Sequence, residues 1–186
     1  MNTQDAVALL APAFPGHGGV WADFGAGDGT FTAALARLRG PGSTIYAVDR
    51  NAAALRSLGR RVQVVGVDVL PIVGDFTQPL ELPGAARQGL DGMLFANALH
   101  FVPDPEVVLG RLVTLLRPGG HVVIVEYARR AASRWVPYPI EPARLGQIAA
   151  AAGLSEPSIT ATRPSNYGGN LYVARLTYLG KGALSK

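Results

Sequence analysis

The 186-residue sequence contains no cysteine. Disulfide bonds, thiolate metal sites and a cysteine nucleophile are therefore all excluded. Histidine is scarce as well: the three histidines lie far apart, and no pair of carboxylates has the spacing of metal ligands, so the sequence predicts no metal site. Long hydrophobic runs are also missing, since no apolar stretch approaches the ~20 residues that a membrane-spanning helix needs.

The amino terminus lacks the basic residue that precedes the apolar core of a secretory signal peptide. Its short apolar run instead follows an acidic residue, Asp5. We therefore expect a cytoplasmic protein that has no membrane partner.

Lysine is nearly absent, because fifteen of the seventeen basic residues are arginine. An excess of basic over acidic residues can indicate nucleic-acid binding. Here, however, the arginines are spread along the chain, and the densest cluster is Arg129, Arg130 and Arg134. A net charge of +4 is more typical of a solubility feature. A nucleic-acid partner is therefore the less favoured alternative.

Short apolar strands alternate with amphipathic helices, a pattern typical of a parallel sheet with helices on both faces. The strands are predicted at residues 20–25, 43–49, 69–75, 90–99, 121–127, 157–164 and 170–179. The helices are predicted at residues 3–10, 30–39, 51–65, 105–117 and 143–153. We expect the last two strands to be antiparallel neighbours.

The end of the helix at 51–65 is ambiguous, because the segment RRVQVV has strand propensity. Helical spacing of Leu55, Leu58, Val62 and Val65, with Gly66 as a C-cap, favours helix to about Val65. The whole chain is expected to form one domain. It comprises a short helix and lead-in at 1–19, the main domain at 20–179 and a frayed tail at 180–186.

A glycine-rich loop follows the first predicted strand in the segment DFGAGDGTF, residues 23–31. In an open parallel sheet, ligands bind at the carboxyl ends of the strands, where glycines let the backbone approach them closely. A dinucleotide-binding loop requires G-x-G-x-x-G, but Thr30 stands where the third glycine would be. The loop instead reads D-x-G-x-G-x-G, with Asp23, Gly25, Gly27 and Gly29.

Together with four further motifs in order, this loop resembles the class I S-adenosylmethionine-dependent methyltransferases, in their small-molecule-type branch. The motifs are Asp49 closing IYAVD, GDF at 74–76, FANALHFV at 95–102 and LLRPGGHVVIVEY at 115–127. The resemblance covers about Val20 to Tyr127. It implies an α/β fold: a Rossmann-like, doubly wound, seven-stranded, mostly parallel sheet with an antiparallel last strand and helices on both faces. It also implies S-adenosyl-L-methionine as cofactor and S-adenosyl-L-homocysteine as product.

The resemblance assigns the cofactor to the ends of the first four strands. The residues expected to bind it are Asp23, Gly25, Ala26, Gly27, Asp49, Arg50, Asp75, Phe76 and Asn97. Asp49 would accept both ribose hydroxyls, although it could be only a helix N-cap. Asp75 would bind the adenine amine, with Phe76 against the ring, although these could be a turn residue and a core residue.

The acid at the start of the loop, Asp23, would lie near the ammonium group of the cofactor or a bridging water. The backbone from Gly25 to Gly29 would wrap the methionine part. Asn97 would contact the amino-acid end of the cofactor or the substrate, with a turn or cap role as the alternative.

A substrate nucleophile that carries a proton must lose it during methyl transfer. His100 lies where the substrates of the family meet the methyl group, so it is the candidate base or substrate contact. A structural histidine is the alternative. Glu126 and Tyr127 end the fifth strand near the same place, and Tyr127 is a candidate substrate contact, although a core or rim position is the stronger interpretation.

The short lead-in leaves no room for the multi-helix cap that covers small substrates in many relatives. Trp135, Tyr138 and Tyr167 supply aromatic surface for a flat apolar substrate, unless they pack on the core. A second subunit would supply the same cover, so a homodimer stays an alternative. The segment NALH lacks the Pro-Pro-Tyr of base-methylating enzymes, which disfavours a nucleic-acid substrate.

The expected reaction is methyl transfer to an oxygen, nitrogen or carbon nucleophile of a small molecule. An RNA or protein methyltransferase and a catalytically silent cofactor-binding module are the alternatives.

Overall fold

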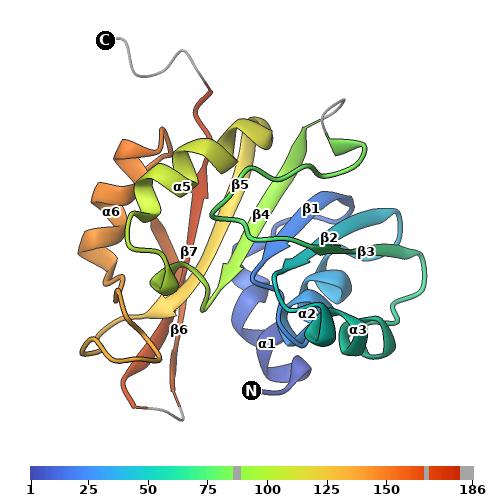
Figure 1. Cartoon of the computed structure of the whole chain (residues 1–186), viewed down its shortest axis with the longest axis horizontal. Helices are drawn as coiled ribbons and strands as arrows, with labels where there is room; N and C mark the ends of the chain where they lie inside the picture. Colours follow the sequence, from blue (N-terminus) through green and yellow to red (C-terminus); the bar gives the residue numbers. More distant parts are fainter. Residues whose placement is uncertain (86–88, 166–167, 181–186) are drawn as a thin grey trace.

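A seven-stranded sheet forms the centre of the computed structural model, which describes residues 1–85, 89–165 and 168–180 (Figure 1). The strands are β1 (Gly19–Phe24), β2 (Ser43–Asp49), β3 (Val67–Val73), β4 (Leu90–Ala96), β5 (Leu116–Tyr127), β6 (Ser158–Pro164) and β7 (Asn170–Thr177). Their order across the sheet is β3-β2-β1-β4-β5-β7-β6. The first five strands pair in parallel, whereas β7 is antiparallel to both β5 and β6, as the sequence predicts.

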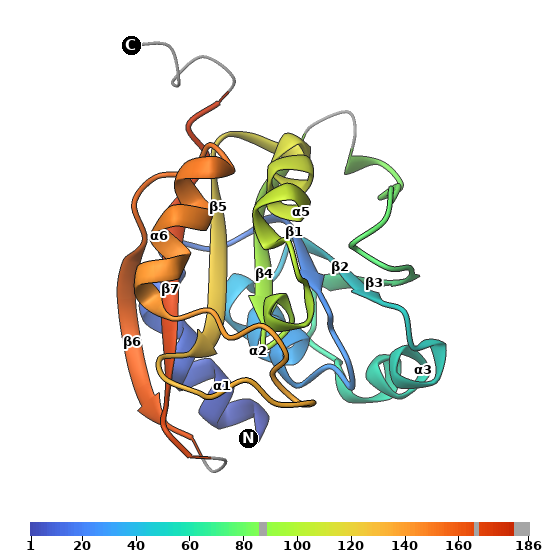
Figure 2. The ribbon, with the colours of Figure 1, turned by 60° about the vertical axis from the view of Figure 1, so that its left-hand side comes forward.

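Helices cover both faces of this sheet (Figures 1 and 2). One layer contains α1 (Thr3–Leu10), α2 (Thr30–Arg39) and α3 (Ala52–Arg61), and the other contains α5 (Pro105–Leu112) and α6 (Pro142–Ala151). Successive side chains of a strand point to opposite faces. In β4, Met93 and Phe95 accordingly join the α5/α6 core, while Leu94 and Ala96 join the core under α1, α2 and α3.

The helix α3 ends at Arg61, so the prediction that it continues to about Val65 is wrong. Val62 has left the helical conformation and is buried, whereas Val65 is 92% exposed. Strand β3 must already be extended at Val67, because Val67 pairs with Ser43, the first residue of β2. From there β2 and β3 pair along their full length. Helical spacing of apolar residues was therefore outweighed by strand pairing, and β3 starts two residues earlier than predicted.

The helix predicted at 105–117 is also too long, because α5 ends at Leu112 and a short 3-10 turn, Val113–Leu115, follows it. The Pro-Gly-Gly sequence lies within β5, at an irregularity in its pairing with β4. A Cβ at Gly120 would lie 2.9 Å from the carbonyl oxygen of Arg117. The glycine therefore permits this close passage of the chain.

The predicted frayed tail at 180–186 falls almost wholly outside the described residues. None of the helices within the described ranges is long and apolar enough to cross a bilayer. The same ranges contain no group of three His, Asp or Glu residues that could hold a metal ion.

Candidate cofactor and substrate site

The glycine loop after β1 is tied to the end of β2 by its own backbone. The N–H groups of Gly25 and Ala26 donate to the carbonyl oxygen of Val48, at 2.9 and 3.0 Å. The N–H of Gly27 donates to Oδ2 of Asp49 at 2.8 Å. The loop is therefore held against the carboxyl end of β2. It follows β1, and the strand order reverses between β1 and β4, which is where open α/β sheets bind ligands.

Two of the loop glycines are required for different reasons. Gly25 has a φ of +81°, and a Cβ there would lie only 2.7 Å from the Cβ of Ala98. Gly27 has a φ of +54°, but a Cβ there would meet no atom closer than the Gly25 oxygen at 4.0 Å. Gly25 thus allows close packing against the segment after β4, whereas Gly27 is required for its left-handed backbone alone, since the space beside it is open.

A cleft of about 690 Å³ opens at the carboxyl ends of β1, β2, β3 and β4. Of the residues expected to bind the cofactor, it is lined by Gly25, Gly27, Asp49, Arg50, Asp75, Phe76 and Asn97. The fold therefore brings together residues from four separate segments. Asp23 and Ala26 do not line this cleft, and Ala26 lines a smaller cavity next to it.

Asp49 stabilises the local backbone and also faces the cleft. Its Oδ1 accepts the N–H of Asn51 at 2.8 Å, and its Oδ2 accepts that of Gly27. A carboxylate has about four acceptor positions, so these two bonds leave capacity for the hydroxyl groups of a ribose. Helix α3 has its own N-cap, because Oδ1 of Asn51 accepts the N–H groups of Ala53 and Ala54.

Asp75 and Phe76 form the part of the cleft that follows β3. Oδ1 of Asp75 accepts the N–H and the hydroxyl of Thr77, at 2.9 and 2.7 Å. These hydrogen bonds, with a smaller contribution from the charges of Arg50 and Arg111, lower the pKa of Asp75. The Phe76 ring is half-buried and packs edge-on to Phe95, with centroids 5.8 Å apart.

Two buried oxygens beside the loop have no hydrogen-bond donor among the described residues. Asp23 is 1% exposed, and its Oδ2 accepts the hydroxyl of Thr32 at 2.6 Å while its Oδ1 is unpartnered. Asn97 adopts a left-handed backbone with φ +55°, and its Oδ1 is likewise unpartnered. Because native proteins rarely leave buried acceptors unsatisfied, these atoms fit a ligand that brings a hydrogen-bond donor, such as an ammonium group.

Burial raises the pKa of Asp23 to about 7, with the hydrogen bond from Thr32 lowering it and the charge of Asp49 raising it further. The carboxyl group is therefore poised between its two protonation states near neutral pH. A positively charged ligand nearby would favour the ionised state.

A second cavity, of about 380 Å³, adjoins the cleft and shares Gly25, Gly27 and Asn97 with it. Its other walls include Tyr127 at the end of β5 and residues of α1 and β6. Arg163 and Asp5 lie there and form an ion pair at 3.1 Å. Neither residue could be predicted as part of the site from the sequence, because no local pattern indicates that α1 and β6 meet.

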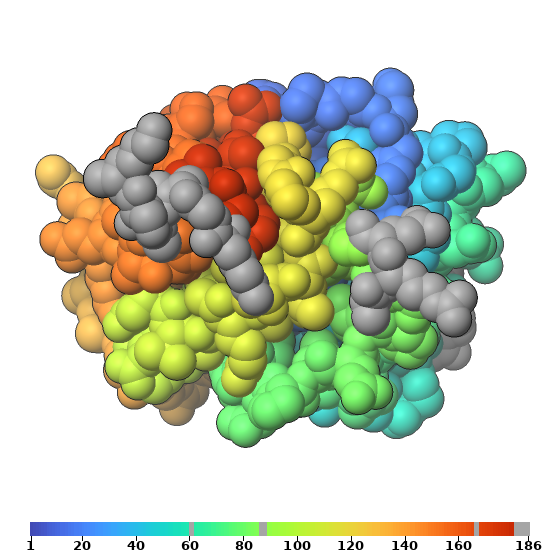
Figure 3. All heavy atoms as spheres, turned by 90° about the horizontal axis from the view of Figure 1, so that it is seen from above, coloured from blue at the N-terminus to red at the C-terminus, as the bar shows by residue number. Residues whose placement is uncertain are grey.

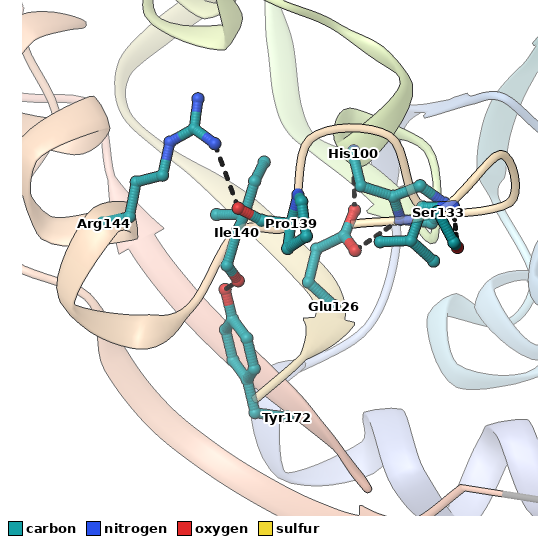
Figure 4. Close-up of polar contacts among 8 residues, drawn as sticks. His100, Glu126, Ser133, Pro139, Ile140, Arg144 and Tyr172 are labelled. Atoms are coloured by element: carbon teal, nitrogen blue, oxygen red, sulfur yellow. Dashed lines mark hydrogen bonds and ion pairs between the residues drawn. The ribbon is translucent and has the colours of Figure 1, made fainter. Parts of the chain in front are cut away.

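His100 lies in a short 3-10 turn after β4 and is paired with Glu126 on β5 (Figure 4). Its Nδ1 lies 2.7 Å from Oε2 of Glu126, and its backbone N–H donates to Oε1 at 3.2 Å. Since an ionised carboxylate only accepts, the hydrogen of this contact lies on Nδ1. Both side chains are buried, at 3% and 0% exposed, and neither lines the two cavities.

The segment 128–141 passes over this pair and is fixed at several points (Figure 4). The N–H of Tyr138 donates to the carbonyl oxygen of His100 at 3.0 Å, and the hydroxyl of Tyr172 donates to that of Ile140 at 2.8 Å. Arg144 donates to the carbonyl oxygen of Pro139 at 3.0 Å. The segment therefore forms a fixed cover over the His100–Glu126 pair.

The aromatic residues expected to touch the substrate are placed differently from one another. Tyr127 is 9% exposed and lines the smaller cavity. Trp135 and Tyr138 are 64% and 40% exposed, and neither lines the cleft or the smaller cavity. Arg134 lies over the Trp135 ring, 4.5 Å from its centroid. Tyr167 falls outside the described residues.

Comparison with known families agrees with this arrangement. A family profile described as a methyltransferase domain matches residues 22–124, which is more than half of the chain. The chain belongs to this methyltransferase family. The family and fold expected from the sequence are thereby confirmed.

Two curated proteins share part of their length with this methyltransferase chain. A "Ubiquinone biosynthesis O-methyltransferase" of Cupriavidus pinatubonensis is 33% identical over 104 residues, which are 55% of this chain and 39% of that protein. A "Probable cobalt-precorrin-6B C(15)-methyltransferase (decarboxylating)" of Pyrobaculum aerophilum is 33% identical over 107 residues, covering 53% of this chain and 55% of that protein. The matches thus span about two-fifths and about half of these relatives.

A solved structure resembles the chain over almost all of its length. It is the 1,6-didemethyltoxoflavin-N1-methyltransferase of Burkholderia thailandensis with bound 1,6-didemethyltoxoflavin and S-adenosylhomocysteine. Its TM-score is 0.72 at 26% identity, and the match covers 96% of this chain and 78% of that chain.

The raised pKa of Asp23 predicts a pH-dependent stability. An acid with a higher pKa in the folded state favours folding while it is protonated, and this advantage is lost as pH rises from about 4 through about 7. We expect Asp23→Asn to be more stable than the wild type at about pH 8, by up to about 4 kcal/mol, and to lose nearly all of this advantage by about pH 4. Thermal unfolding of the ligand-free protein measures this. A constant difference across the range, as expected for the exposed-site control Asp68→Asn, would contradict it.

The His100–Glu126 contact predicts a large loss of stability on removal of one partner. We expect Glu126→Ala to lower the free energy of unfolding by about 3 kcal/mol, since His100 then loses its buried acceptor. Glu126→Gln, which keeps an acceptor, should recover part of the loss. Urea denaturation measures both, with Glu156→Ala as the exposed control. Equal losses in Glu126→Ala and the control would rule out the pair as a stabilising contact.

Proposed function

We propose that this protein transfers the methyl group of S-adenosylmethionine to a small molecule. The observation that carries the proposal is the cleft at the reversal of the strand order, in which the carboxylate of Asp49 lies next to an open glycine loop. Asn97 lines both cavities, and its unpartnered oxygen adds an acceptor for an ammonium group beside that loop. Asp23 lines neither cavity, so its unpartnered oxygen would reach that group through a bridging water. These features suit the adenosine and amino-acid parts of one molecule.

The adenosine part would be held in the larger cleft. Asp49 would accept the ribose hydroxyls, with Arg50 beside it, and Asp75 and Phe76 would bind the adenine. The amino-acid part would extend along Gly25, Ala26 and Gly27 into the smaller cavity. The bound cofactor supplies a methyl group that its positive sulfur already activates, so the protein has mainly to orient the reactants and exclude water.

The nucleophile, an oxygen, nitrogen or carbon of the substrate, forms a bond to the methyl carbon as the carbon–sulfur bond breaks and its electron pair moves to sulfur. Where the nucleophile carries a proton, we assign its removal to His100, whose Nδ1 is held by Glu126. Because His100 is buried beneath the segment 128–141 and lines neither cavity, this role requires that segment to move away from the pair. Tyr127 would contact the substrate from the smaller cavity. Trp135 and Tyr138 line neither cavity, so they would contact only a substrate that extends beyond both cavities.

Binding of S-adenosylhomocysteine tests the assignment of Asp49. We expect Asp49→Asn to weaken binding roughly 10-fold to 100-fold, because hydrogen bonds to a charged acceptor are lost. Isothermal titration calorimetry measures the dissociation constant. Asp68→Asn removes an exposed carboxylate from β3 and should leave binding unchanged. A wild type that binds neither the cofactor nor its product would overturn the proposed function.

Arg163 is assigned to the carboxylate of the cofactor's amino-acid part, because it lines the smaller cavity. Its ion pair with Asp5 is more than one-third exposed, so exchanging that partner costs little. We expect Arg163→Gln to weaken S-adenosylhomocysteine about 10-fold and to leave 5′-methylthioadenosine, which lacks the amino-acid part, unaffected. Arg37→Gln is the exposed control. Equal weakening of both ligands would show that Arg163 does not contact the carboxylate.

A further inference from the structure

A third cavity, of about 300 Å³, lies at the end of the sheet opposite the cofactor cleft. It is formed where β1, β4 and β5 begin, by the lead-in to β1, the last turn of α2 and the start of β5. Figure 3 looks onto this end of the molecule, where the blue lead-in lies beside the yellow start of β5. Its lining includes His17, Trp21, Arg39, Asp91, Arg117 and His121.

One wall of this cavity contains a buried guanidinium. Arg39 is 6% exposed and donates to the carbonyl oxygens of Gly18, at 2.9 and 2.7 Å, and Pro15, at 3.3 Å. No carboxylate among the described residues forms an ion pair with it. Burial lowers the pKa of Arg39, and the charge of Asp91 only partly opposes this. A buried cation without a paired anion is unfavourable, so an added anion here would be stabilising.

The surrounding charges are mostly positive. Asp91 is already engaged, because it forms an ion pair with Arg117 at 2.6 Å and accepts the N–H of Val20 at 2.6 Å. Burial and the charges of Arg175, Arg39 and Arg117 lower the pKa of the His121 imidazole. The positive charges of three arginines near the cavity therefore exceed the negative charge of its one carboxylate, Asp91.

A buried hydrogen-bond donor lies in the same wall. Trp21 is 2% exposed, and its Nε1 has no acceptor among the described residues. The guanidinium carbon of Arg39 lies over its ring, 4.9 Å from the centroid. An indole N–H can only donate a hydrogen bond, and so can the guanidinium groups of the arginines around it. A ligand with acceptor oxygens would therefore suit all of these groups.

We propose that this cavity binds a small oxyanion, a phosphate ion or the phosphate group of a larger metabolite, through Arg39, Arg117, His121 and the indole N–H of Trp21. The site lies at the amino ends of the strands, so it is separate from the methyl-transfer site and does not depend on the proposed function. Its occupation would neutralise the buried charge of Arg39 and satisfy the indole donor at once.

Trp21 offers a direct probe, because the chain contains only two tryptophans. In a Trp135→Phe background, Trp21 is the sole tryptophan, and its fluorescence is titrated with sodium phosphate at constant ionic strength, balanced by sodium chloride. We expect a saturable change in emission, and an increase of at least about fivefold in the midpoint concentration on Arg117→Gln, since one charged contact is lost. Arg117 is 61% exposed, so this variant should fold normally. Arg56→Gln, an exposed control on α3 with the same change in charge, should leave the midpoint unchanged.

The NMR titration of His121 provides a second readout for the case that the emission is insensitive. Bound phosphate should raise the pKa of His121, because an anion favours the imidazolium. Tighter binding of glycerol 3-phosphate than of inorganic phosphate would identify a phosphate ester as the ligand. Tighter binding of inorganic phosphate would identify the free ion. The proposal is overturned if neither readout responds to phosphate beyond the chloride control, or if Arg117→Gln and Arg56→Gln titrate alike.

Discussion

The hydrogen bonds between the glycine loop and the end of β2 are the contacts on which the site depends. Three consecutive N–H groups, from Gly25 to Gly27, donate to the last two residues of β2, Val48 and Asp49. They fix the loop against the end of β2, and the space beside Gly27 stays open. Gly25 and Gly27 line both the cleft and the smaller cavity, so this connection positions a wall that the two share.

The same contacts explain why Asp49 cannot be assigned a single role. Its carboxylate completes the local backbone structure and is also the acid best placed to meet a ribose. From the sequence, the alternative to ligand binding is a helix N-cap for Asp49 and a turn position for Asp75. In the structure each carboxylate makes the backbone contacts and also lines the cleft. Backbone hydrogen bonds thus fix the position of both carboxylates in the cleft, so a structural role for these side chains is compatible with the proposed binding role.

Most strands of the sheet could be predicted from the sequence, because short apolar segments bounded by turn residues are a local signal for a strand. Elements whose limits depend on distant partners were predicted less well. Helix α3 ends early because β3 must align with β2. Neither the spacing of apolar residues nor the helix propensity near Val65 indicates where this strand pairing begins. The pairs Arg163–Asp5 and His100–Glu126 could not be predicted from the sequence either, since each joins segments that meet only in the folded chain.

Strand β7 is made after β6 yet lies between β5 and β6 in the sheet. During synthesis, β5 must therefore keep an open edge until the final strand emerges, and β6 has no sheet partner until then. Tyr172, which anchors the segment over His100 through Ile140, belongs to that final strand. The cover over the His100–Glu126 pair is thus completed only when the last strand is inserted. Unpaired strand edges promote aggregation, so this interval is the vulnerable stage of the protein's biogenesis.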